Sequence, residues 1–418
     1  MARRPTIVTA HDYGRTFIDG RQPFHGVERN GHAECNRPPR GSRAHSGVPR
    51  HGVLGKLQDA LEITYRAGFV DVIVHADRLP DDMLRRIPNE TPPPPRDLAR
   101  SASGTPPRAV RRQQQPPPSM GAHVGTLAND ALFPERNEPG GTVFLPSDLT
   151  EYVPNQYPWN TIGRVVADHF NSTGVGSGGT GAFVSSSVVI TSNHILSSSM
   201  GANFTQAVYC YGADGSIFAP ISFRPGASTD LNSPPALPVR GVMRWNHIAD
   251  PNSISPFEQA FDYAFLSVEL PSTKTFSPPG WMQLLNYSKN WNGLPIWNAG
   301  GYPNSGKYTP VGFQTGDPVV HQNGTIADSQ TKGDNVKGLR LAHGMDFLDG
   351  MSGGPIFGWP LGVLAGPRIV GVQATHGSGD VVEPSSSKKW NHASGGGAML
   401  LLFSLALEYF GWAFGTTK

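Results

Sequence analysis

The chain of 418 residues is long enough for one large domain or two ordinary ones. Its 50 glycines and 39 prolines make up more than a fifth of the residues, which argues against an all-helical protein and favours short strands joined by turns. Only 16% of the residues are charged and the net charge is +2, so the composition excludes a strongly basic protein of the kind that binds nucleic acids or anionic membranes.

The charge is unevenly distributed along the chain. Residues 1–118 contain 19 Lys and Arg against 12 Asp and Glu, whereas the remainder contains 15 against 20. This difference indicates two compositionally distinct parts. Together with the strand-like pattern that begins near Tyr157, it predicts an N-terminal extension over residues 1–149 and a folded domain over residues 150–418.

Most of the extension lacks the pattern of a packed domain. From Met1 to about Arg50 it is rich in Arg, His, Gly and Pro without apolar periodicity, and we expect it to be disordered. Residues 54–88 differ, because a helix-like apolar spacing precedes the strand-like run FVDVIVHA and a short second helix. Proline runs then predict an extended linker, at residues 92–95, 106–107 and 116–118. We expect a removable pro-segment, whose loss leaves an N-terminus between about residues 112 and 160.

The domain after Tyr157 consists of short β-branched and aromatic runs separated by Gly, Asn, Ser and Pro, a pattern typical of a sandwich or barrel. The clearest predicted strands are residues 183–191 and 263–268. The last apolar run, 398–414, is shorter than a bilayer span and contains Glu408, so it predicts a helix docked on the domain in preference to a membrane anchor.

The cysteines and the asparagine sequons bear on whether the protein is secreted or intracellular. Cys35 and Cys210 lie one in each part, so disulfides cannot form the framework of the fold, and the sequence leaves open whether the two pair. The N-terminus lacks the apolar run of a signal peptide. Sequons nevertheless favour a secreted glycoprotein, and they lie at Asn89, Asn171, Asn203, Asn286 and Asn323.

The segment DGMSGGP, residues 349–355, surrounds Ser352 with glycines that give the backbone unusual freedom and leave room beside the hydroxyl. It also fits the nucleophile elbow of α/β-hydrolases. That alternative is disfavoured because two glycines and Pro355 follow the serine where a helix must begin. Only 66 residues remain for the acid and the histidine that must follow it.

A serine hydroxyl becomes a strong nucleophile only when a base takes its proton, and a carboxylate usually orients that base. His194 follows the first predicted strand, and Asp262 stands at the head of the second. The order is therefore His, Asp, Ser, with gaps of 68 and 90 residues.

Three motifs, VVITSNHIL, FDYAFLSVEL and LDGMSGGP, together resemble the trypsin and chymotrypsin family of serine endopeptidases, and more narrowly its glutamyl-endopeptidase-like branch. YPWNTIGRVV (157–166) and GGYPNSGKY (300–308) are similar to segments of that branch, and the resemblance covers about residues 150–418. It implies an all-β fold of two six-stranded antiparallel barrels with a C-terminal helix.

The resemblance also implies roles for individual residues. Ser352 would attack the peptide carbonyl, His194 would transfer the proton and Asp262 would fix the imidazole. The N–H groups of Gly350 and Ser352 would form the oxyanion hole. The implied reaction is peptide-bond hydrolysis through an acyl-enzyme intermediate.

The sequence departs from the trypsin pattern just before the serine. Met351 stands where trypsin-like zymogens usually have an aspartate that pairs with the new N-terminus, so activation by that ion pair is excluded. Asp346 lies six residues before the serine, where an aspartate selects Arg or Lys in trypsin but is usually structural in the other branch, and the structural interpretation is preferred. Gln373 and His376 are further candidates for the substrate pocket, and they leave specificity open.

The histidines show no metal-ligand spacing, so neither a metal nor a cofactor is expected. The expected partners are protein or peptide substrates, not nucleic acid or membrane, and we expect an extracellular monomer. An alternative function is a catalytically inactive homologue that uses the cleft expected between the two barrels to bind a protein.

Overall fold

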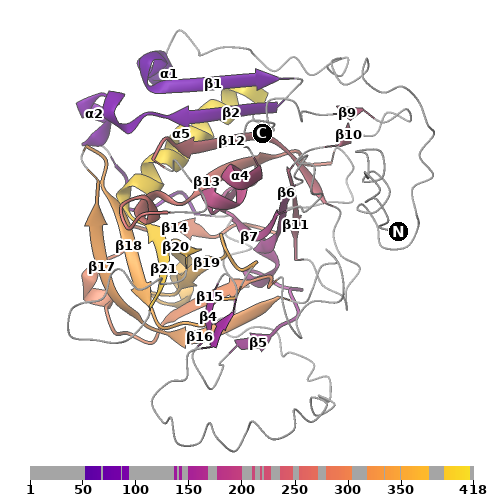
Figure 1. Ribbon diagram of the computed structural model, residues 1–418, viewed down its shortest axis with the longest axis vertical. Coiled ribbons are helices and arrows are strands. Elements are labelled where there is room, and N and C mark those ends of the chain that lie inside the picture. The colour runs from indigo at the N-terminus through magenta and orange to yellow at the C-terminus, as the bar shows by residue number, and fades with distance from the viewer. Residues whose placement is uncertain are drawn as a thin grey trace, which may run out of the picture.

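The computed structural model is mostly β, with few helices (Figure 1). The residues described are 52–66, 69–85, 87–93, 136–138, 141–143, 149–167, 177–199, 210–211, 217–218, 221–226, 236–247, 254–271, 279–303, 318–333, 335–348, 350–375 and 390–414. Met1 to Arg50, Cys35 and the proline runs after residue 93 lie outside them, as does His376.

Six strands of the domain close into the first barrel. Their order is β12, β11, β6, β7, β8, β13, and β13 pairs back to β12. Inward residues such as Val165, Phe183 and Leu266 are fully buried. The prediction of a closed six-stranded antiparallel barrel is therefore confirmed here. The bounds are β6 Ile162–Ala167, β7 Ser177–Phe183, β8 Val188–Thr191, β11 Ile221–Pro225, β12 Leu237–Trp245 and β13 Ala264–Val268.

The second half of the domain is a strongly curled sheet. Its order is β17, β18, β21, β20, β19, β15, β16, β5, and β14 pairs with β20. The described strands of this sheet form a half-barrel, where the sequence predicted a second closed barrel. The bounds are β5 Leu149–Glu151, β14 Gln283–Leu284, β15 Trp297–Gly301, β16 Val319–Gly324, β17 Ile326–Lys332, β18 Gly338–His343, β19 Pro355–Gly358, β20 Arg368–Thr375 and β21 Asn391–Gly395. The architecture is chymotrypsin-like.

The remaining strands and α-helices are short, apart from one helix. They are α1 Gly52–Gly55, β1 Leu61–Arg66, β2 Phe69–Val74, α2 Asp81–Leu84, β3 Arg136–Glu138, β4 Gly141–Val143, α4 Asn193–Ser199, β9 Cys210–Tyr211, β10 Ile217–Phe218 and α5 Gly397–Phe414.

The C-terminal helix α5 confirms the predicted helix at 398–414. It is long and apolar enough to cross a membrane, yet most of its side chains are packed inside the protein. Leu400, Phe403 and Tyr409 belong to the largest core cluster, which also contains Phe265 of the first barrel. Burial of this apolar surface explains why the helix can dock on the domain.

Two local predictions are wrong in detail. The segment predicted as one strand over 183–191 is two strands, because a turn after Phe183 is closed by a hydrogen bond from the Val184 N–H to the Val188 carbonyl (2.9 Å). The helix-like spacing after residue 54 gives mainly strand β1, because β1 pairs along its length with β2. The strand-like run FVDVIVHA does form β2, and the short second helix is α2.

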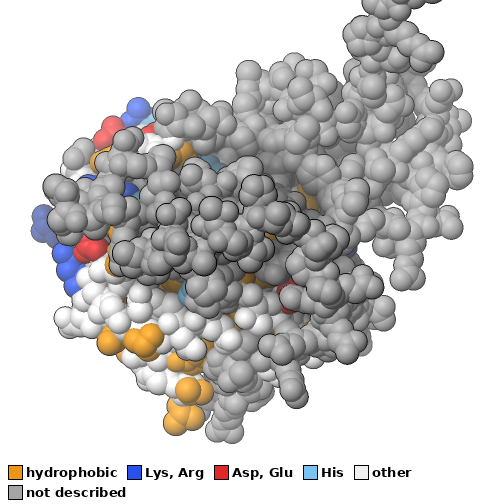
Figure 2. Space-filling model, turned by 60° about the horizontal axis from the view of Figure 1, so that its bottom comes forward, with side chains coloured by type: hydrophobic (Ala, Val, Ile, Leu, Met, Phe, Trp, Pro, Cys, Tyr) orange, Lys and Arg blue, Asp and Glu red, His pale blue; other side chains and the backbone are white. Residues whose placement is uncertain are grey.

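Residues 52–93, which the sequence placed in the extension, pack on the domain. The hairpin β1–β2 extends the first barrel sheet, and in Figure 1 it lies beside α5 at the top of the molecule. Among the described residues visible in Figure 2, separate hydrophobic side chains lie on a mostly uncharged surface, and Lys and Arg side chains gather at one side of it.

Candidate active site

His194 and Asp262 lie together at one end of the first barrel. His194 is the second residue of α4, directly after β8, and Asp262 follows a short 3₁₀ helix at the start of β13. The His194 Nδ1 atom lies 2.6 Å from Asp262 Oδ2, and the His194 N–H donates to Asp262 Oδ1 at 2.8 Å. The carboxylate thus fixes both the backbone and the ring of the histidine.

The burial of the two side chains differs in a way that matters chemically. Asp262 is fully buried, whereas the His194 side chain is 21% exposed. An Nδ1–H that donates to the carboxylate leaves Nε2 as the ring nitrogen able to accept a proton. The ring is therefore oriented for general-base chemistry at Nε2.

The Ser352 loop comes from the second half of the domain and is held against the first barrel by Thr180. The Thr180 N–H donates to the Ser352 carbonyl at 2.8 Å, and its hydroxyl donates to the Gly350 carbonyl at 2.9 Å. The Thr180 hydroxyl also accepts from the Tyr302 N–H at 2.9 Å. One threonine side chain therefore joins the serine loop to β7 and to β15.

Gly353 shows how closely this loop approaches the histidine segment. A Cβ atom at Gly353 would collide with the Thr180 carbonyl and the Thr191 hydroxyl, and would lie 2.6 Å from the Ser192 nitrogen. Ser192 is two residues before His194. The residues flanking Ser352 and His194 are thus in direct contact where the two halves meet.

The backbone of the serine loop leaves two donors available. Gly350 and Gly353 have φ values of 87° and 79°, a left-handed conformation that glycine adopts most readily. Within the described part of the chain, the Gly350 and Ser352 N–H groups donate no hydrogen bond. Backbone donors without a partner suit an oxyanion hole, which needs them fixed before charge develops.

Met351 is an apolar anchor of the same loop. It is fully buried in a small cluster with Val319, Phe347 and Leu348. Its sulfur also accepts from the Leu348 N–H at 3.4 Å. The position where trypsin-like zymogens have an aspartate is therefore occupied here by a packed side chain.

Asp346 lies beside a histidine pair. Its N–H donates to His321 Nδ1 at 3.2 Å, and its carboxylate Oδ2 lies 3.7 Å from the same nitrogen. Burial, reinforced by nearby His321, lowers the pKa of fully buried His343 to about 3. His343 is therefore neutral at neutral pH.

Gln373 is fully buried and supports the serine loop through its backbone. The Gly353 N–H donates to the Gln373 carbonyl at 2.7 Å, and the Gln373 N–H donates to the Gly354 carbonyl at 2.8 Å. Its side-chain Nε2 donates to the Gly300 carbonyl at 3.5 Å. His376 lies outside the described residues.

Sequence reasoning missed Thr180. Its only sequence signal is its place in the run SGGTGAF ahead of the histidine motif, since its contacts with the serine loop connect residues 170 positions apart. Among the described residues, no group of three or more His, Cys, Asp and Glu side chains could hold a metal ion.

Part of the chain matches a known family. Residues 179–366 match the family model of the trypsin-like peptidase domain, a range that includes His194, Asp262 and Ser352. No curated protein matches the chain. One similar solved structure is titled "Structure of Glu endopeptidase in complex with MPD"; it is 16% identical, covers 62% of this chain and 95% of its own, and has a TM-score of 0.40. The family match and the fold confirm the resemblance to the trypsin and chymotrypsin family.

Proposed function

We propose that this chain, which contains a trypsin-like peptidase domain, is a serine endopeptidase that cuts peptide bonds through an acyl-enzyme intermediate. The observation that supports this most directly is the pairing of His194 with buried Asp262 beside the loop of Ser352. A protein that only binds a partner through this site has no need of an oriented imidazole. The glutamyl-endopeptidase-like branch stays a prediction.

In the proposed mechanism, the Ser352 hydroxyl attacks the carbonyl carbon while His194 Nε2 takes its proton. Asp262 holds the imidazole in the required tautomer and stabilises the imidazolium. The N–H groups of Gly350 and Ser352 donate to the oxyanion. His194 then returns the proton to the leaving amine, and water hydrolyses the acyl-enzyme by the reverse sequence.

The test is covalent labelling with a fluorophosphonate probe. The folded, fully processed protein should be labelled, and Ser352→Ala should lose the label completely. Ser329→Ala is the matched control, since Ser329 is also buried but lies on β17. A folded, processed protein that takes no label would instead support the inactive binding homologue.

For specificity, we propose that Asp346 is structural and does not select Arg or Lys. Its burial and its contacts with His321 support this role. A peptide-library cleavage profile should show no preference for Arg or Lys before the cut bond. A strong preference that Asp346→Asn abolishes would favour the trypsin-like role.

We further propose that the protein is secreted and glycosylated. Asn89 and Asn323 are exposed sequon residues, and Asn286 is partly buried. Treatment of protein from a glycosylating eukaryotic host with an N-glycosidase should lower its mass, and replacing Asn89 and Asn323 by Gln should reduce that difference.

A further inference from the structure

We call residues 52–92 the strap. The N-terminal part of the strap contacts the first barrel. Strand β2 pairs in parallel with β12, Val70–Val74 alongside Gly241–Trp245. Arg244 donates to both oxygens of Asp71, from Nε at 3.2 Å and from Nη2 at 2.9 Å. Two-point contacts of this kind are stronger and more specific than ordinary surface ion pairs.

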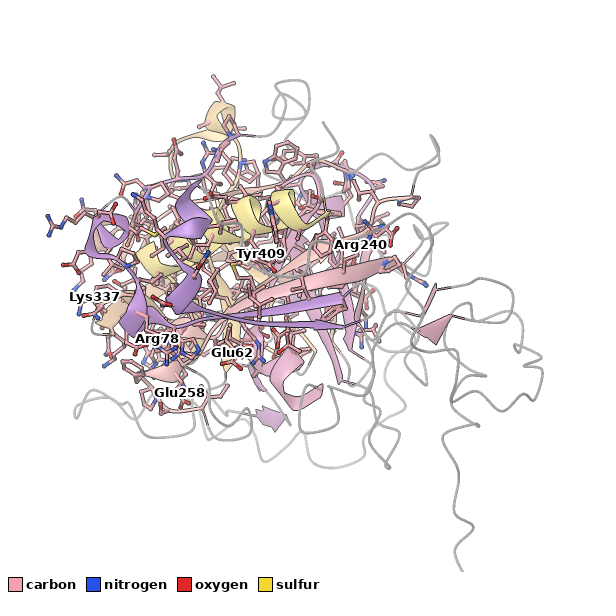
Figure 3. The ribbon with its side chains drawn as sticks, turned by 90° about the horizontal axis from the view of Figure 1, so that it is seen from above. Glu62, Arg78, Arg240, Glu258, Lys337 and Tyr409 are labelled. Carbon is pink, nitrogen blue, oxygen red and sulfur yellow. The ribbon has the colours of Figure 1, made fainter. Side chains whose placement is uncertain are left out.

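The same part of the strap completes the apolar core. Leu57, Val72 and Val74 are fully buried in the cluster that contains the side chains of α5. Gly241 of β12 leaves room for side chains of both β2 and α5, because a Cβ atom at this position would lie 2.8 Å from Val70 and 3.0 Å from Phe410 of α5. Figures 1 and 3 show the hairpin and α5 together along β12.

The strap then reaches a segment that joins the two halves of the domain. Over residues 281–286, the Met282 N–H donates to Phe183 of the first barrel at 3.0 Å, and the Leu285 N–H donates to Ile369 of β20 at 2.8 Å. The strap residue Thr91 pairs with this segment.

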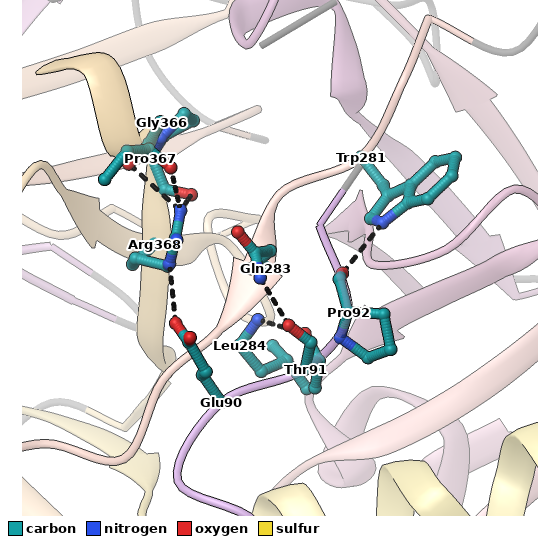
Figure 4. A network of polar contacts seen from close by, with 10 residues as sticks. Glu90, Thr91, Pro92, Trp281, Gln283, Leu284, Gly366, Pro367 and Arg368 are labelled. Carbon is teal, nitrogen blue, oxygen red and sulfur yellow. Dashed lines mark hydrogen bonds and ion pairs between the residues drawn. The ribbon is translucent and has the colours of Figure 1, made fainter. Parts of the chain in front are cut away.

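Thr91 makes three contacts there (Figure 4). Its N–H donates to the Leu284 carbonyl at 3.0 Å, and its hydroxyl accepts from the Leu284 N–H at 2.8 Å. Its carbonyl accepts from Gln283 Nε2. The backbone of Leu284 and the side-chain Nε2 of Gln283 therefore have their partner in the strap.

Glu90 extends the contact to the second half. Its carboxylate lies 3.4 Å from Arg368 Nε on β20. Arg368 Nη1 donates to the carbonyls of Ala365 and Gly366, at 2.6 and 3.2 Å. Glu90 thus pairs with the arginine that fixes the loop before β20 (Figure 4).

We propose that the edge of β12, helix α5 and segment 281–286 form a binding surface whose ligand is the strap, and that the strap stays bound when its peptide connection to the domain is cut. A cut between residues 112 and 160 would then give a two-chain protein, in which the strap holds the two halves together. This differs from the pro-segment expected from the sequence, which would leave the domain.

The experiment uses the full chain with a recognition site for a site-specific protease inserted after residue 93. A Ser352→Ala background removes self-cleavage and makes the result independent of the proposed activity. After cutting, the fragment with residues 52–92 should co-elute with the remainder on size exclusion in native buffer and separate only in denaturant. Separation in native buffer, with the remainder still folded by circular dichroism, would overturn the proposal.

Point variants test the named contacts. Asp71→Asn and Thr91→Val should each speed dissociation of the cut fragment by about tenfold, because each removes buried or charge-assisted hydrogen bonds. Asp82→Asn, an exposed change on α2 within the strap, should leave the rate unchanged. Dissociation of both test variants at the rate of the unchanged strap would contradict the assigned contacts.

Discussion

Both carboxylate oxygens of Asp262 accept hydrogen bonds from His194, one from the backbone N–H at 2.8 Å and one across 2.6 Å from Nδ1. Asp262→Asn puts an NH₂ group in place of one oxygen, so one of these two contacts is lost or the ring is forced into the other tautomer. We expect kcat to fall by about 10³- to 10⁴-fold. Steady-state hydrolysis of a peptide substrate measures this, and Asp328→Asn on β17 is the control. Full activity of Asp262→Asn would show that the histidine needs no carboxylate.

Gly353→Ala should push apart the two halves of the site and lower the free energy of unfolding. The added methyl group would meet the Thr180 carbonyl and the Thr191 hydroxyl, which are fixed by the sheet. Gly293→Ala is a matched control, because Gly293 has a similar φ of 73° but open space around it. The free energy of unfolding of the control should fall only by what an alanine in the left-handed backbone conformation costs, about 1–2 kcal/mol. Chemical denaturation should show a larger loss for Gly353→Ala, and equal losses would show that the loop can move aside.

Met351→Asp should destabilise the protein and should not create a trypsin-like switch. The new carboxylate would be buried among Val319, Phe347 and Leu348, with no cation provided by that cluster. Burial of an unpaired charge typically costs about 3–5 kcal/mol. Met351→Leu keeps the volume and should cost less than about 1.5 kcal/mol. Thermal unfolding of the two variants distinguishes packing at this position from an electrostatic role.

His343 should make stability depend on pH in the mildly acidic range. Its pKa is about 3 in the folded protein against 6.5 for the free side chain, so the unfolded state binds the proton first as pH falls. The free energy of unfolding is therefore unaffected by protonation of this histidine above pH 6.5. It decreases by about 1.4 kcal/mol per pH unit as pH falls from 6.5 towards 3. Urea unfolding between pH 7 and pH 4 should show this slope, and His343→Phe should flatten it. A parallel slope in the variant would assign the effect to another group.

The sequence was most informative where function depends on short local patterns. The motifs around His194, Asp262 and Ser352 and helix α5 could be predicted from residue types and spacing, whereas the barrel class was implied by the family resemblance. The strap could not, because β2 pairs with a strand about 170 residues away and nothing local specifies that partner. Around residue 61 the local pattern favoured a helix, and the pairing of β1 with β2 overrode it. Thr180 was missed for a similar reason, since its partners lie in another half of the domain.

The contact between the strap and α5 has a consequence for biosynthesis. Val70 and Phe410 lie over the same glycine of β12, although they come from the two ends of the described chain. Domains generally fold as units during synthesis, but this core cannot close until the last helix has left the ribosome. Such long-range closure also slows folding, because chain entropy is lost before the contacts form. The apolar face of the nascent β1–β2 hairpin therefore stays exposed until α5 is synthesised. We expect chains shortened before residue 397 to depend on chaperones or to aggregate.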